Sequence, residues 1–189
     1  MWIALALNAV MFVVEVAAGV WANSTGLIAD GLDMLADATA YGIALAAVGR
    51  GSRFKANAAT LSGTLLLLLG IGVLVDVVRR YYGGETPEGA WMIGVAVIAL
   101  AVNATVLRLL GKQRQDEVHI RATWVFTRAD VVANIAVILS GIAVLLTDIR
   151  YFDLIVGAAI GIYVIKEARE ILIDAKQARA EASSTITPR

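Results

Sequence analysis

The chain lacks cysteine altogether, and its 189 residues include only two prolines and one histidine. Without cysteine it can form neither a disulfide scaffold nor a zinc site built from thiolates. With so little proline it contains no proline-rich linker. Sixteen lysines and arginines balance sixteen aspartates and glutamates. This balance lacks the basic excess that is typical of nucleic-acid binding, so no nucleic-acid partner is expected.

The chain is instead rich in long apolar runs. Hydrophobic residues make up 59% of it and charged residues 17%, with a mean hydropathy of +0.77. In a typical soluble domain, about half of the residues are apolar and about a quarter are charged. A helix needs about 20 mostly apolar residues to cross a bilayer. Such runs predict an all-α integral membrane protein with six transmembrane helices, at residues 2–22, 26–49, 56–79, 88–111, 118–146 and 152–171.

The six spans are expected to form one transmembrane domain over residues 1–174. Residues 175–189 are polar, and we expect them to form a frayed helix followed by a cytoplasmic tail, with no soluble C-terminal domain. The first span lacks a basic segment at its start and carries Asn8 and Glu15. It is therefore not expected to be a cleaved signal peptide.

The placement of the basic residues predicts the orientation, because cytoplasmic loops are enriched in lysine and arginine. One side receives only Arg79, Arg80 and Arg150, and Arg128 lies within the fifth span. The other side receives the remaining twelve, which are Arg50, Arg53, Lys55, Arg108, Lys112, Arg114, Arg121, Lys166, Arg169, Lys176, Arg179 and Arg189. Both termini are therefore expected in the cytoplasm, with the protein in the inner or plasma membrane.

Carboxylates at membrane depth are the most informative feature of the chain, since an ionisable group there is costly and indicates function. Asp30, Asp33 and Asp37 are spaced three and four apart in the second span, which places them on one helix face. Asp37 lies roughly 16 Å along the helix from Gly26, at about 1.5 Å per residue. We therefore expect Asp37 near the bilayer midplane.

The fifth span brings a further carboxylate to the same depth from the opposite side. Asp130 lies roughly 15 Å along the helix from Ile120, at about 1.5 Å per residue. In a hydrocarbon core about 30 Å thick, Asp130 and Asp37 can meet at the midplane. Asn134 follows one turn after Asp130 on the same face. The candidate metal ligands are therefore Asp33, Asp37, Asp130 and Asn134.

Several carboxylates at one buried point cannot all be ionised without compensation, which either protons or a divalent cation can supply. A site that alternates between these two states would exchange protons for metal. Oxygen ligands suit hard cations, and zinc also accepts carboxylates. The cation is expected to be cargo, and no cofactor is expected.

The other polar residues in the spans have plainer interpretations. Asp30 belongs either to the site or to an outer vestibule, and Glu15 serves either packing or a proton path. Arg128 is expected to be an ion-pair partner, and His119 a solvated loop residue. Asn8 and Asn103 are expected to form hydrogen bonds between helices. Gly157 and Gly161 form a small-xxx-small pattern, which is typical of close helix packing.

Residues 24–38, SerThrGlyLeuIleAlaAspGlyLeuAspMetLeuAlaAspAla, resemble the signature of the cation diffusion facilitator family. The AlaAspValValAlaAsn run at residues 129–134 and the sixth-span phrase PheAspLeuIleValGly are also similar to that family. The resemblance runs from Asn8 to about Ile173, and its second- and fifth-span motifs are the specific part.

This resemblance implies a proton-coupled exporter of divalent metal, usually homodimeric, with its ion between the second and fifth spans. Asp33 and Asp37 match the second-span pair, and Asp130 matches the second place of the fifth-span pair. The first place falls on Phe126, where the family has histidine or aspartate. Asn134, Thr127 or a water would complete the shell. Family members also usually carry a cytoplasmic metal-binding domain, which we do not expect here.

The expected function is efflux of a divalent metal cation by antiport with protons across the membrane. The cargo would be zinc first, or else cadmium, iron, cobalt or manganese. One alternative is a membrane-embedded metal-dependent enzyme such as a phospholipid head-group transferase, although the expected DGxxAR pattern is missing. A second is a non-transporting homologue, as Phe126 and Arg128 indicate. We expect a transporter rather than an enzyme.

Overall fold

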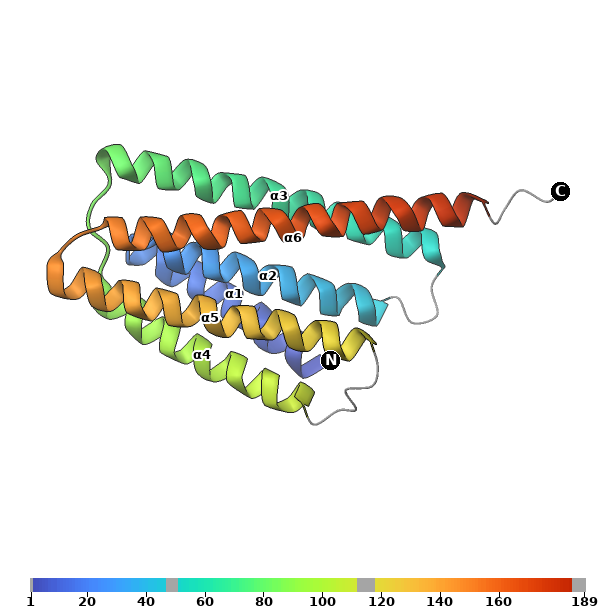
Figure 1. Ribbon diagram of the computed structural model, residues 1–189, viewed down its shortest axis with the longest axis horizontal. Helices are drawn as coiled ribbons and strands as arrows, with labels where there is room; N and C mark the ends of the chain where they lie inside the picture. Colours follow the sequence, from blue (N-terminus) through green and yellow to red (C-terminus); the bar gives the residue numbers. More distant parts are fainter. Residues whose placement is uncertain (1, 47–50, 112–117, 185–189) are drawn as a thin grey trace.

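The computed structural model describes residues 2–46, 51–111 and 118–184. Over these residues the regular elements are six α-helices, which run lengthwise beside one another as a bundle (Figure 1). They are α1 (Trp2–Trp21), α2 (Thr25–Ala46), α3 (Ser52–Gly83), α4 (Gly89–Gly111), α5 (Val118–Thr147) and α6 (Tyr151–Ser184). The start of α1 and the end of α6 lie toward the same end of the bundle (Figure 1). The all-α prediction is confirmed.

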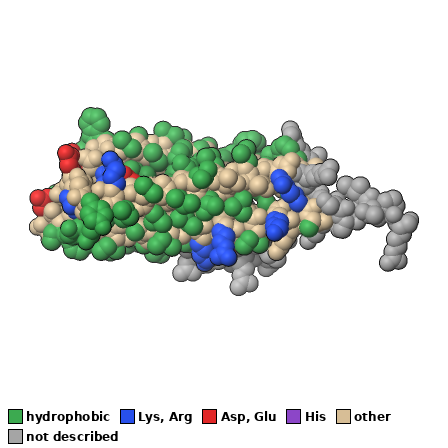
Figure 2. Space-filling model, turned by 90° about the horizontal axis from the view of Figure 1, so that it is seen from above, with side chains coloured by type: hydrophobic (Ala, Val, Ile, Leu, Met, Phe, Trp, Pro, Cys, Tyr) green, Lys and Arg blue, Asp and Glu red, His purple; other side chains and the backbone are tan. Residues whose placement is uncertain are grey.

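Four of the described helices are long and apolar enough to cross a membrane. The qualifying segments are Trp2–Trp21, Phe54–Gly83, Gly89–Arg108 and Asp130–Thr147. Helices α2 and α6 are also long enough, but charged side chains interrupt their apolar runs, such as Asp30, Asp33 and Asp37 in α2. The surface agrees with this assignment, because hydrophobic side chains cover the middle of the visible face and charged ones gather toward its ends (Figure 2). The chain is a multi-pass membrane protein.

The observed helices follow the expected spans closely except at α6. The expected sixth span ends at residue 171, whereas the helix continues without a break to Ser184. Its partner α3 is also longer than the expected span 56–79, and the two pack along each other (Figure 1). Residues 175–184, which were expected to form a frayed helix, are helical and continuous with α6. Residues 185–189 lie outside the described part.

Two glycines set the distance between α6 and its neighbours. A Cβ added at Gly157 would lie 2.8 Å from the carbonyl carbon of Thr25, and one at Gly161 would lie 3.1 Å from Cγ1 of Val73. Glycine therefore allows α6 to approach the start of α2 and the middle of α3 closely. The prediction that this pattern marks close packing is confirmed.

A buried aspartate fixes the start of α2 on the start of α6. The carboxylate of Asp153 accepts hydrogen bonds from Ser24 Oγ at 2.6 Å, Thr25 N at 2.7 Å, Thr25 Oγ1 at 2.8 Å and Gly26 N at 3.0 Å. Negative charge at a helix N-terminus is favourable, and these donors have no partner within α2 itself. Asp153 thus holds α2 at a fixed depth beside α6, which positions the carboxylates further along α2.

Candidate metal centre

Helix α2 directs its aspartates into the bundle. Asp30 is fully buried and Asp33 is 3% exposed, while Asp37 is partly exposed. On α5, Asp130 is 3% exposed and Asn134 is fully buried. The prediction that these residues share inward-facing sides of their helices is therefore confirmed. Their surroundings are otherwise apolar, with Leu27, Ala29, Leu32 and Val137 in the neighbouring core.

Helices α2 and α5 pack against each other and bring their carboxylates together. The carboxyl group of Asp130 lies within hydrogen-bonding reach of those of Asp33 and Asp37. The expected meeting of second- and fifth-span carboxylates is therefore present. Glu15 of α1 is fully buried and lies near Asp30 and Asp130.

A chain of amide hydrogen bonds holds Asn134 in place. Asn134 Nδ2 donates to Asp30 Oδ2 at 2.6 Å, and Asn134 Oδ1 accepts from Asn103 Nδ2 at 3.2 Å. These bonds link α2, α4 and α5, so the expected interhelical bond of Asn103 is confirmed. The same expectation for Asn8 is wrong, since its Nδ2 donates to Ala4 O at 3.1 Å within α1. Ala4 is one turn earlier, the nearest acceptor that Asn8 can reach.

Several buried carboxylate oxygens have no hydrogen-bond donor among the described residues. They are Glu15 Oε1 and Oε2, Asp30 Oδ1, Asp33 Oδ2, Asp37 Oδ2 and Asp130 Oδ2. Most buried polar groups in proteins are hydrogen-bonded, and a buried charge needs a partner. A bound cation or added protons would supply that partner. The cluster therefore has the chemistry of a cation site.

The carboxylates neighbour one another without forming a finished coordination shell. Among the side chains that the structure describes, no three histidine, cysteine, aspartate or glutamate residues surround a point as the ligands of an ion would. The expected ligand position at Phe126 lies outside the described side chains. So do Thr127, the expected ion-pair residue Arg128 and the expected loop residue His119.

The sequence prediction missed one carboxylate of the cluster. Glu167 of α6 lies within hydrogen-bonding reach of Asp33 and of the Tyr163 hydroxyl. It also lies close to Asp37. Its position within the apolar run 152–171 was a usable signal. It was missed because it falls near the end of that run, where a carboxylate is normally solvated.

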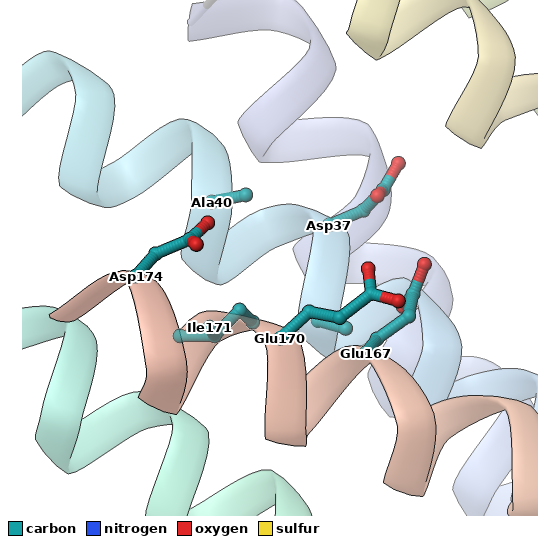
Figure 3. A pocket seen from close by; sticks show the side chains of 7 residues that line it. Asp37, Ala40, Glu167, Glu170, Ile171 and Asp174 are labelled. Carbon is teal, nitrogen blue, oxygen red and sulfur yellow. The ribbon is translucent and has the colours of Figure 1, made fainter. Parts of the chain in front are cut away.

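A groove between α2 and α6 leads from the surface to these groups. Its volume is about 200 Å³, and it is lined by Ala36, Asp37, Ala40, Glu167, Glu170, Ile171 and Asp174. Glu167 and Glu170 extend from α6 toward α2, and Asp174 stands further along the groove (Figure 3). Its polar lining is thus entirely acidic.

A comparison with known families identifies the family of this chain. A family model described as the cation efflux transmembrane domain matches residues 1–178. The chain belongs to this family. The resemblance to the cation diffusion facilitators is thereby confirmed for this cation efflux domain. Because the family comprises transporters, the head-group transferase alternative is not supported, and the chain is a transporter homologue rather than an enzyme.

Curated relatives of this cation efflux domain have names that specify metals. The metal cation efflux system protein CzcD of Cupriavidus metallidurans is 28% identical over 86% of the chain and 55% of its own length. Zinc transporter ZitB of Pectobacterium atrosepticum is 27% identical over 88% of the chain and 56% of its own length. A cadmium, cobalt and zinc/H(+)-K(+) antiporter of Bacillus velezensis is 23% identical over 86% of the chain and 56% of its own length. The chain thus spans just over half the length of these relatives.

Proposed function

We propose that this cation efflux domain exports a divalent metal cation in exchange for protons. Asp33, Asp37 and Asp130 bind the ion, and Asn134 is the fourth candidate ligand. The supporting observation is the buried pairing of α2 and α5 carboxylates with oxygens that lack donors. Zinc is the first candidate cargo, because it accepts carboxylate ligands and because relatives are named for it. Cadmium, iron, cobalt and manganese are the others.

Proton coupling follows from the need to balance charge at the site. Clustered carboxylates in an apolar interior repel one another and have lost their hydration. A divalent cation offsets both costs while it is bound. When it leaves, protons must take its place, so each return of the empty site carries protons the opposite way.

We also propose that all six helices cross the inner or plasma membrane, with both termini in the cytoplasm. Residues 1–174 form the transmembrane domain, and residues 175–189 lie on its cytoplasmic side. Lys55, Arg108 and Arg179 at one end of the bundle support this orientation by the positive-inside rule. We propose a homodimer in the bilayer, which chemical cross-linking in native membranes would test.

Transport into proteoliposomes tests the site and the coupling together. Vesicles containing a zinc-sensitive dye should show zinc entry with the parent chain and none with Asp37→Ala or Asp130→Ala. Glu88→Ala is the matched control, because Glu88 is an exposed carboxylate at the start of α4. Entry that is unchanged in both site variants would contradict the assignment. Flux that ignores an imposed pH gradient would contradict antiport.

The non-transporting homologue remains the second candidate because position 126 is phenylalanine. It predicts zinc binding without flux. Calorimetric titration of the purified chain with zinc, alongside the vesicle assay, separates the two. Binding with no dye response in any pH gradient would favour this candidate.

A further inference from the structure

Glu167 is a carboxylate at the contact between α6 and α2, yet no ion pair with it is seen among the described residues. It lies on the face of α6 that looks toward α2, in register with Glu170 and Asp174 at spacings of three and seven. The adjacent Lys166 is directed elsewhere and pairs with Glu170 at 3.8 Å in an exposed contact. Among the described residues no lysine or arginine pairs with Glu167. Its charge is therefore available to another partner.

The contacts of Glu167 connect it to the α2–α5 carboxylates. Its carboxyl group lies within hydrogen-bonding reach of Asp33, which in turn lies within reach of Asp130. Two carboxyl groups so close together require either a shared proton or a shared cation. Helix α6 thus adds a third helix to the pairing of α2 with α5.

A separate observation shows that this junction lacks a partner of the kind that a cation would supply. Asp33 and Asp130 are each only 3% exposed, and one oxygen of each, Oδ2, has no donor among the described residues. Such oxygens are costly to bury, and a positively charged ligand is what they lack. The groove is lined by Asp37 and Glu167, which lie next to Asp130 and Asp33, so an ion from outside can come close to this junction.

We propose that Glu167 is a further protein ligand of the transported cation, beside the three aspartates, and that the groove bordered by Glu170 and Asp174 is the entry route of the ion. The inference rests on the proposed transport function and deepens it. Position 126 of this chain offers a phenyl ring, which cannot bind a metal as an oxygen or imidazole nitrogen does. A carboxylate from α6 restores the ligand that α5 lacks. The two groove acids attract cations and are not required to hold the bound ion.

Zinc titration of the purified full chain tests the assignment of Glu167. Glu167→Gln keeps the size of the side chain and one acceptor oxygen but removes its charge. We expect zinc affinity to fall about tenfold or more, since the number of charged ligands sets the affinity of a carboxylate site. If Glu167→Gln does not fold, Glu167→Asp keeps the charge but retracts it, and should also lower the affinity. An affinity unchanged within about twofold in the variant that folds overturns the proposal.

Tyr163→Phe is the matched control for a purely structural role. It removes the hydroxyl within reach of Glu167 and leaves the carboxylate. Affinity should fall less than in Glu167→Gln, because the hydroxyl can orient the carboxylate but the charged ligand itself stays in place. If Tyr163→Phe weakens zinc binding as much as Glu167→Gln does, Glu167 acts through packing and the ligand assignment is wrong.

The entry route has a different readout from the ligand. Glu170→Gln combined with Asp174→Asn should slow zinc uptake at low zinc concentration and leave the equilibrium affinity unchanged, because charges along a route change rates of encounter. Unchanged uptake would overturn the route. Asp33→Ala separates this inference from the proposed function. If Asp33→Ala abolishes binding while Glu167→Gln does not, only the further inference fails; if neither does, the proposed function fails.

Discussion

Asn134 supports the site through its hydrogen bonds, whether or not it also binds the ion. Its amide nitrogen donates to Asp30 at 2.6 Å and its oxygen accepts from Asn103 at 3.2 Å. Both polar ends are therefore engaged inside the protein, although the oxygen retains a second lone pair. The hydrogen bond neutralises part of the cost of burying Asp30. Its interpretation as a ligand stays a prediction.

Replacing Asn134 by alanine tests these two roles against each other. The change leaves Asp30 buried without its donor, so unfolding free energy should fall by about 1–3 kcal/mol. Thermal unfolding in detergent measures this loss. The control is Asn57→Ala, which removes only an exposed bond from Arg179. If Asn134 is also a ligand, zinc affinity falls as well. A stability equal to that of the control would contradict the buried network.

Site residues could be predicted where the sequence itself shows a carboxylate within an apolar run, because burying its charge there costs free energy. This holds for Asp33, Asp37 and Asp130, which lie deep in apolar runs. A solvent-exposed position is not expected there. Glu167 also lies in an apolar run, but near an end, where the sequence does not show whether the side chain faces water or the bundle. The acceptor role of Asp153 depends on the contact between α2 and α6, which no local pattern encodes.

Helix boundaries were predictable wherever the membrane span and the helix end together. Helix α6 is the exception, because its helix outlasts its apolar run. Residues 172–184 include Ala, Lys, Gln and Glu, which favour helix regardless of burial. The packing of α3 along α6 adds to this preference. A prediction based on hydropathy alone cannot detect a polar continuation of a span.

The contact between α2 and α6 sets the geometry of the site at the scale of elements. Gly157→Ala places a methyl group 2.8 Å from the backbone of Thr25, which must move α6 or the start of α2. Overpacking of this kind costs about 1–3 kcal/mol. Since Asp153 holds the same helix ends together, we expect zinc affinity to fall together with the thermal unfolding temperature.

Gly72→Ala is the matched control for this change. Gly72 is also a helical glycine, but no heavy atom lies within 4 Å of the Cβ that would be added there. In an exposed helix, alanine should be neutral or stabilising by up to about 1 kcal/mol. Equal effects of the two substitutions on the unfolding temperature would show that helix preference, rather than the α2–α6 contact, is responsible.

At the scale of the whole molecule, the bundle places its charges in separate zones. The acids of the site lie inside the apolar part of the bundle, while the visible basic side chains lie toward the ends (Figure 2). The formal net charge of zero conceals this separation. Such a distribution combines a cation site in the interior with a rim that orients the chain in the bilayer.

The proposed orientation can be tested cleanly because the chain has no native cysteine. Lys55 at the start of α3 and Glu88 before α4 are both exposed, and α3 separates them by its full length. A membrane-impermeant maleimide should label Glu88→Cys in intact cells and Lys55→Cys only after permeabilisation. The opposite pattern would reverse the assignment of the termini. Labelling of both sites in intact cells would mean that α3 does not cross the membrane, since only a spanning helix keeps its two ends on different sides.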